Sequence, residues 1–438
     1  RFAGALPPVQ SNDGGLVSNY LKDPHTGLPS AQTPDVSQAS DKLHLDRIAP
    51  PTVGTSVGGA YGTRVSGGVG FFFSDILGNQ NLSVFLQANG TIRDIGGGAF
   101  YTNRGNRLNY GVGVSHIPTA YGQIGLVDGG GGTQFAQIIQ RIYRSQVVGR
   151  VSYPLSQTNR FELSAGGTRY GFGVTVRDQF GRQRDPDDLR RSSSLPDPFY
   201  LSQIGLAYVG DFSKSGLTSP LQGGRYRFQV TPQFGSRNFV SVLADYRRYF
   251  YRKPFTFAVR GLHQGNYGAS SSGFTGEFGD VFVRETLGDP YQLAFVRGYS
   301  FSSIFNERTC QIDQSQCDIG NLYGTRVALG SAEVRLPVLG PEVLGLSTFK
   351  YVPTDLVLFA DAGIAWTDEN FDNLALRTSV PSQQLGGVTG QVAAEPVTSA
   401  GISARVNVLG AIILEAFYAR TFQRTKPWDF GLVLRPGW

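Results

Sequence analysis

The residues whose types and spacing suggest chemistry are one arginine and two acids in separate segments. Arg297 lies within F-V-R-G-Y, Glu333 within G-S-A-E-V-R and Asp361 within F-A-D-A-G. Guanidinium N–H groups match the geometry of carboxylate oxygens, so the three side chains could form a hydrogen-bonded latch. The alternative is that each charge lines a wet surface without touching the others.

Motifs for covalent catalysis are weak. Residues 54–58 match G-x-S-x-G, but a nucleophile elbow needs a strand, a turn and a helix, and here the motif lies in a glycine-rich strand pattern. The glycine run at 129–132 lacks the following Lys-Ser or Lys-Thr of a phosphate-binding loop. The acids at 185–188 could bind calcium weakly, although a solvated turn is the simpler explanation. We therefore predict no enzymatic activity, no cofactor and no metal.

The two cysteines, Cys310 and Cys317, lie close together in a polar stretch. This spacing predicts a local disulfide in an oxidising compartment, with a metal clip or a free pair as the alternatives. None of the four histidines is spaced to chelate a metal together with the cysteines. They are His25, His44, His116 and His263.

The composition separates this chain from most soluble and helical membrane proteins. Charged residues make up only 16%, whereas 58 of 438 residues are glycine and 12% are aromatic. A soluble domain carries about a quarter charged residues, and a transmembrane helix needs roughly 20 consecutive apolar residues, which the chain lacks. The net charge of +6 is spread along the chain, which argues against a nucleic-acid partner.

Hydrophobic alternation predicts strands with one apolar and one polar face. Tyr226, Phe228 and Val230 alternate with arginine, glutamine and threonine, and residues 401–408 repeat the pattern. Aromatic residues gather at strand ends, for example at 249–251, as membrane interfaces favour. The expected strands are 54–62, 66–74, 81–91, 95–103, 107–116, 135–153, 158–177, 198–212, 223–235, 238–250, 255–266, 321–338, 354–367, 400–409, 411–422 and 428–437.

The predicted fold class is all-β, a 16-stranded antiparallel transmembrane β-barrel with a long extracellular loop folded into the lumen. A soluble β-sandwich is the alternative, but it would be unusually large at this length. We expect two parts, 1–51 as an N-terminal linker or periplasmic extension and 52–438 as the barrel. The chain starts without a signal peptide, which we interpret as a mature or incomplete sequence.

The connections are expected to divide by length between the two sides of the membrane. Short turns at 75–80, 235–238 and 409–410 would be periplasmic. Longer segments would be extracellular. These are 117–134, 178–197, 267–320 and 368–399.

Several motifs, taken in order, resemble one family. Val296-Arg297-Gly298-Tyr299, an inward Glu333 and an F-x-D-x-G strand around Asp361 are similar to the marks of the BamA/TamA/FhaC superfamily of outer-membrane insertases and translocators. The turn at 74–78, the P-x-x-G-x-R-like stretch at 219–225 and the terminal aromatic Trp438 resemble it too. The resemblance implies a sixteen-stranded barrel whose sixth loop enters the lumen, with Arg297 at the loop tip and Glu333 and Asp361 as its partners on the wall.

The family resemblance also implies a function and its location. It predicts insertion or translocation of proteins at the outer membrane of a diderm bacterium. Partners would be outer-membrane lipids and lipopolysaccharide, unfolded client proteins, and a periplasmic domain or accessory subunits. A structural membrane anchor and a passive solute pore are the alternatives.

Two departures from the family pattern stand out. No POTRA repeats precede the barrel, and residues 1–51 look more like members with a TolB-like propeller upstream. Pro436 in the last expected strand lacks an amide donor for pairing.

A weak seam between the first and last strands is the expected gate. Glycines pack little in a strand, although they could simply fit tight barrel curvature. The candidate gate residues are Gly54, Gly58, Gly59, Gly62, Gly431 and Trp438.

Overall fold

The structure is a computed structural model, and it divides into two compact units, Arg1–Asp41 and Lys42–Trp438. All residues described by the structure belong to the second unit. They are 42–49, 52–56, 64–89, 94–128, 133–178, 197–268, 285–290, 292–305, 307, 320–342, 345–349, 351–367, 394–408 and 412–436.

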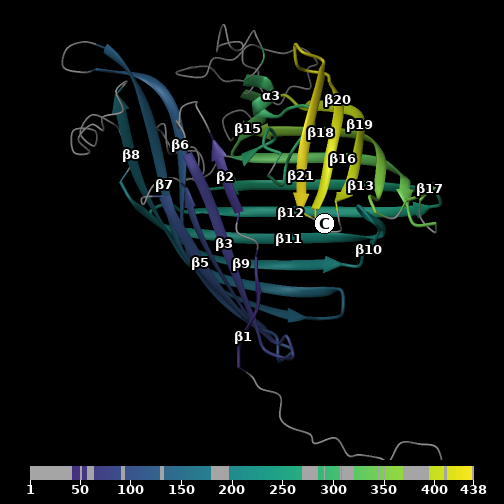
Figure 1. The fold of residues 1–438 in the computed structure, drawn as a ribbon, viewed down its shortest axis with the longest axis horizontal. Coiled ribbons are helices and arrows are strands. Elements are labelled where there is room, and N and C mark those ends of the chain that lie inside the picture. Colours follow the sequence, from purple (N-terminus) through teal and green to yellow (C-terminus); the bar gives the residue numbers. More distant parts are fainter. Residues whose placement is uncertain are drawn as a thin grey trace, which may run out of the picture. The chain divides into compact units, whose positions relative to one another are not determined.

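The described residues of the second unit lie mainly in strands (Figure 1). A short helix, α3 (Phe301–Phe305), and a 3-10 turn, η5 (Gly320–Leu322), interrupt them. The all-β prediction is thereby confirmed. The strands are β1 (His44–Ile48), β2 (Thr52–Ser56), β3 (Arg64–Ser74), β4 (Gln80–Asn89), β5 (Ile95–Asn103), β6 (Asn109–Asp128), β7 (Thr133–Pro154), β8 (Asn159–Asp178), β9 (Phe199–Asp211), β10 (Lys214–Ser215), β11 (Pro220–Gly235), β12 (Phe239–Arg252), β13 (Phe255–Tyr267), β14 (Glu285–Thr286), β15 (Tyr323–Gly324), β16 (Arg326–Gly340), β17 (Ser347–Thr348), β18 (Thr354–Trp366), β19 (Val397–Val408), β20 (Ile412–Thr421) and β21 (Trp428–Pro436).

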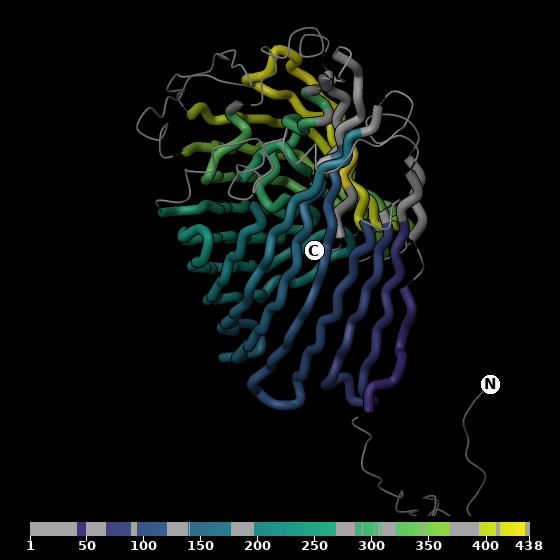
Figure 2. The backbone as a smooth tube through the Cα atoms, turned by 90° about the vertical axis from the view of Figure 1, so that its left-hand side faces the viewer, coloured from purple at the N-terminus to yellow at the C-terminus, as the bar shows by residue number. Residues whose placement is uncertain are grey.

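Nineteen of these strands form one sheet, in which the long strands pair antiparallel with their neighbours along the chain. β1 and β2 both pair with β3, at its two ends, and pairing then continues strand by strand to β21. The sheet is strongly curved (Figure 2). Among the described residues, no pairing joins β21 to β1 or β2. Closure into a barrel of sixteen strands therefore stays a prediction.

Large apolar side chains remain exposed on one face of the sheet, here called the outer face. Leu163, Leu206 and Val230 lie side by side on β8, β9 and β11 and are 50%, 56% and 46% exposed. The same face includes Val112, Val147, Phe257, Leu358, Ile402, Tyr418, Phe430 and Leu432. Exposed apolar surface costs about 25 cal/mol per Å² in water, and soluble monomers rarely expose large contiguous patches of it. The outer face therefore suits contact with lipid.

The opposite face, the inner face, is covered over β16 and β18–β21 by a segment between β13 and β16. We call residues 285–290 and 292–305 the inserted segment. Its Val296 and Tyr299 are buried in one apolar cluster with Val327 of β16 and Val397 of β19. The long connection expected at 267–320 thus contains a part that packs on the wall.

Three expectations about connections need correction or comment. The loop expected at 117–134 is wrong, because β6 and β7 pair as far as Asp128 and Thr133. The expectation that the turns at 75–80 and 235–238 lie on the same side of the membrane is wrong. Seven antiparallel pairings separate β3 from β11, so the two turns lie at opposite edges of the sheet. β1 already pairs with β3 inside the stretch expected to be a linker, although the division at residue 51 itself stays a prediction.

The two edges of the sheet can be named from these connections. The edge with the turn at 75–80 is called the short-turn edge. The edge from which the inserted segment enters is called the long-loop edge. No helix in the described part of the chain is long and apolar enough to cross a membrane.

Candidate functional site: a buried arginine among carboxylates

Two glycines let the inserted segment approach the wall closely. Gly298 has φ +92°, a backbone conformation that residues other than glycine rarely adopt. A Cβ added there would lie 2.7 Å from the Thr421 side chain and 3.1 Å from that of Ala419. At Gly363 of β18, an added Cβ would lie 2.7 Å from the Val296 side chain. The glycines of V-R-G-Y and F-x-D-x-G therefore have a steric role in this docking.

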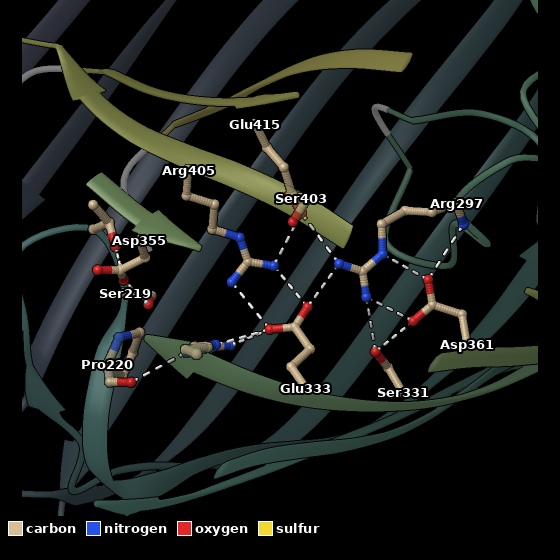
Figure 3. Close-up of polar contacts among 12 residues, drawn as sticks. Ser219, Pro220, Arg297, Ser331, Glu333, Asp355, Asp361, Ser403, Arg405 and Glu415 are labelled. Atoms are coloured by element: carbon tan, nitrogen blue, oxygen red, sulfur yellow. Dashed lines mark hydrogen bonds and ion pairs between the residues drawn. The ribbon is translucent and has the colours of Figure 1, made fainter. Parts of the chain in front are cut away.

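The turn formed by the inserted segment directs Arg297 onto the inner face (Figure 3). Its Nε and Nη2 donate to the two carboxylate oxygens of Asp361 at 2.7 and 2.8 Å, a bidentate pair. Nη1 lies 2.9 Å from Glu333 Oε1 and 3.1 Å from Glu415 Oε1. The guanidinium carbon lies 3.7 Å from the centre of the Phe359 ring, a cation–π distance. One loop side chain thus contacts β16, β18 and β20.

Two wall arginines extend this group into a network. Arg405 of β19 donates to both oxygens of Glu333, at 3.0 and 2.6 Å, and to Glu415 at 3.2 Å. Arg335 of β16 lies 2.7 Å from Glu333 Oε2. Glu333 therefore accepts from three guanidinium groups, including that of Arg297. We call Arg297, Arg335, Arg405, Glu333, Asp361 and Glu415 the arginine cluster.

Burial makes the balance of charge in the arginine cluster energetically important. The Arg297 side chain is 3% exposed, and those of Asp361 and Glu415 are 2% and 0% exposed. Burial alone lowers the pKa of Arg297, but the charges of Asp361 and then Glu333 outweigh it and raise that pKa above its ordinary value. The guanidinium stays charged, and removing one member leaves the buried cluster of three arginines and three carboxylates with an uncompensated charge.

The residues after Arg297 add a second set of contacts. The Tyr299 hydroxyl donates to Gln423 Oε1 at 2.7 Å. Arg424 donates to the Gly298 carbonyl and pairs with Glu307. The connection between β20 and β21 therefore also holds the inserted segment, through Gln423 and Arg424.

The arginine cluster also reaches the turn between β9 and β11, at the short-turn edge. Arg335 donates to the Pro220 carbonyl at 3.1 Å. Thr218 and Ser219 both donate to Asp355 of β18, the latter at 3.2 Å. A chain of polar contacts thus runs from the inserted segment to the opposite edge of the sheet. The last residues in this chain of contacts, Ser219 and Pro220, belong to the P-x-x-G-x-R-like stretch at 219–225.

The structure brings Arg297, Glu333 and Asp361 together, while their functional role as a latch stays a prediction. Sequence reasoning did not assign Glu415 or Arg405 to the site. Their only signal was a place on the polar face of an alternating strand, which many other charges share.

The predicted gate is described only in part. Gly54 pairs with Ser66 of β3, and Gly431 pairs with Phe417 of β20. The other gate residues and the expected disulfide lie outside the described residues. They are Gly58, Gly59, Gly62, Trp438, Cys310 and Cys317. In the described part of the chain, no group of three or more His, Cys, Asp or Glu side chains could hold a metal.

The turn at 74–78 is stabilised by hydrogen bonds to Asp75. Asp75 is buried, and its Oδ1 accepts from the Gln80 amide at 2.8 Å. Gly78 has φ +71°, and its amide donates to the Asp75 carbonyl at 3.1 Å. The aspartate and glycine of D-x-L-G therefore fix a tight connection between β3 and β4.

Comparison with known proteins supports a similarity of fold. No family model and no curated protein sequence matches this chain. BamA from Haemophilus ducreyi, in a form lacking POTRA domains 1–3, superimposes with a TM-score of 0.51 at 15% identity, over 88% of this chain and 69% of that chain. CdiB from Acinetobacter baumannii gives a TM-score of 0.48 at 12% identity, over 85% of this chain and 56% of that chain. The expected likeness to BamA thus holds for the fold, and an upstream propeller stays a prediction.

Proposed function

We propose that this chain is an outer-membrane β-barrel that takes part in inserting or translocating proteins. The single observation that carries the proposal is the bidentate Arg297–Asp361 pair, which holds part of the connection between β13 and β16 against the inner face of the sheet. The lipid-compatible outer face supports a place in the outer membrane. The BamA-like fold supports the same general kind of protein.

The physical argument for insertion rests on the ends of the sheet. A strand edge without a partner exposes N–H and C=O groups, which cost several kcal/mol each in lipid. Such an edge can pair with an incoming strand of a client protein. Residues 52–56 and 428–436 pair on one side only in the described part of the chain. The inserted segment would brace the wall next to this seam, because it contacts β18, β19 and β20.

Reconstitution into vesicles tests this proposal. An unfolded test barrel is added in urea, and its folding is followed by its shift in mobility on an unheated gel. We expect faster folding with this chain than into empty vesicles, and slower folding with Arg297→Ala. Arg260→Ala is the control, because it breaks a wall ion pair with Asp245 that does not involve the inserted segment.

Equal folding rates with and without the chain would refute the insertase role. A planar-bilayer recording distinguishes the solute pore. A permanently open pore conducts steadily, whereas a lumen obstructed by the inserted segment should give small, flickering currents.

A further inference from the structure

A row of polar side chains crosses the outer face of β6–β9, near the middle of β6, β7 and β8 and at the start of β9. His116, Ser145, Arg169 and Tyr200 are paired in register across these four strands. His116 Nδ1 lies 2.8 Å from Ser145 Oγ, and Arg169 Nε donates to the Tyr200 hydroxyl at 3.1 Å. These contacts hold a guanidinium and an imidazole on a face that is otherwise mainly apolar.

A hollow lies directly beside this row, toward the short-turn edge. The next row in register contains Val114, Val147 and Gly167, and the row after it contains Gly149 and Ala165. A Cβ built on Gly167 meets no atom within 4 Å, so the glycine leaves open space. The hollow has a volume of about 680 Å³, and Val114, Val147, Gly167 and Arg169 all line it.

Among the described residues, none packs so closely that it requires the absence of a side chain at Gly167. Gly298, by contrast, is required where the backbone meets other side chains closely. The valines beside Gly167 are half exposed, Val114 at 50% and Val147 at 56%. An apolar trough with a cation at one end is therefore presented to the surroundings of the outer face.

We propose that this hollow binds one membrane lipid with an anionic phosphate headgroup. The phosphate would contact the two basic side chains of the row, Arg169 and His116, both of which line the hollow. One acyl chain would leave the hollow at Gly167 and continue past Ala165 and Leu163 of β8 on the outer face. From Arg169 to Leu163 is six residues, or roughly 20 Å of strand, which is a suitable length for an acyl chain.

The polarity of the neighbouring rows agrees with a headgroup at this level. Further toward the long-loop edge, Arg141 and Asp94 form a buried ion pair at 2.7 Å, so polar side chains continue beyond the row in that direction. Toward the short-turn edge, Leu163 and Leu206 begin the exposed apolar face. The proposal rests on the membrane location proposed above but not on the insertase role.

Native mass spectrometry of the full chain in detergent tests the site. Phosphatidylglycerol and phosphatidylcholine with identical acyl chains are titrated separately, and the bound lipids are counted. We expect one phosphatidylglycerol to be retained at lower lipid concentration than phosphatidylcholine. Arg169→Gln should weaken that retention about tenfold, since it removes a charge-assisted hydrogen bond. Gly167→Leu should abolish it by filling the trough.

Two matched controls keep the result interpretable. Arg420→Gln removes another arginine of the outer face near the long-loop edge, one stacked with Phe422 and Trp428. Gly261→Leu adds the same side chain at another glycine whose Cβ would meet nothing within 4 Å. Both controls should bind the lipid as wild type does, and all variants should keep the gel mobility of the folded form.

Several results would overturn the site. These are equal retention of the two lipids, unchanged binding in Arg169→Gln, or equal losses in the controls. Displacement of the lipid by millimolar inorganic phosphate would also refute it, because the hollow would then take a free anion and not a lipid. None of these readouts depends on insertase activity.

Discussion

Replacing Arg297 by alanine should lower the free energy of unfolding more than replacing Arg260, a partly exposed arginine of the sheet that pairs with Asp245. The substitution removes the bidentate partner of Asp361, which then keeps a contact to Ser331 Oγ at 2.6 Å. Glu333 retains Arg335 and Arg405, and Glu415 retains Arg405. The stranded charge is therefore mainly that of Asp361.

The expected cost follows from this count of partners. Breaking a buried ion pair by removing one member costs about 3–5 kcal/mol, because the other charge is left uncompensated. The double variant Arg297→Ala/Asp361→Ala removes both charges and should be less destabilised than the sum of the two single variants. A coupling energy of about 1–3 kcal/mol is expected for residues in direct contact. Arg260→Ala should cost at most about 1 kcal/mol, because its side chain is partly exposed and Asp245 keeps Arg247.

Urea unfolding in vesicles, followed by tryptophan fluorescence and by gel mobility, measures these differences. The midpoint of unfolding should fall strongly for Arg297→Ala and partly recover in the double variant. If Arg297→Ala unfolds within about 1 kcal/mol of wild type, the pair does not stabilise the docked segment. Strict additivity of the two single variants would show that the two charges do not interact.

Three further predictions use the same unfolding measurement. Glu333→Gln should cost about 3–5 kcal/mol or prevent assembly, because this carboxylate accepts from three guanidinium groups; a loss below about 1 kcal/mol would contradict its central place. Gly298→Ala should cost about 1–3 kcal/mol, because Gly298 has a positive φ and lies close to Thr421. Gly330→Ala should be nearly neutral, because its Cβ would meet nothing within 4 Å, and equal effects of the two substitutions would refute the steric role of Gly298. Asp75→Ala should cost about 1 kcal/mol by freeing the Gln80 amide, and an unchanged midpoint would show that the turn is held by other contacts.

The sequence predicted strand positions well where one face of the sheet carries exposed apolar side chains and the other carries polar ones. The alternation around Phe228 and Ile402 matches strands whose even-numbered side chains are exposed and whose odd-numbered neighbours, such as Arg405, face inward. Residues 117–128 escaped prediction because Pro118 and several polar residues break the apolar period. The pairing of β6 with β7 holds them as strand nevertheless.

The arginine cluster shows what a single sequence can and cannot provide. Arg297, Glu333 and Asp361 lie in recognisable short motifs, so their meeting could be expected. Glu415 and Arg405 carry no motif, and their contact depends on the register Arg405↔Glu415 between β19 and β20. That register is a long-range property of the folded sheet and cannot be obtained from local periodicity.

The arginine cluster also has a consequence for the order of assembly. Arg297 and Glu415 are separated by 118 residues, and β20 is next to the last strand of the sheet. Contacts between such distant residues form late, after the intervening chain has been organised. The Arg297 guanidinium can therefore dock only after the hairpin of β20 and β21 has formed. A molecule whose inserted segment is not docked has not completed folding.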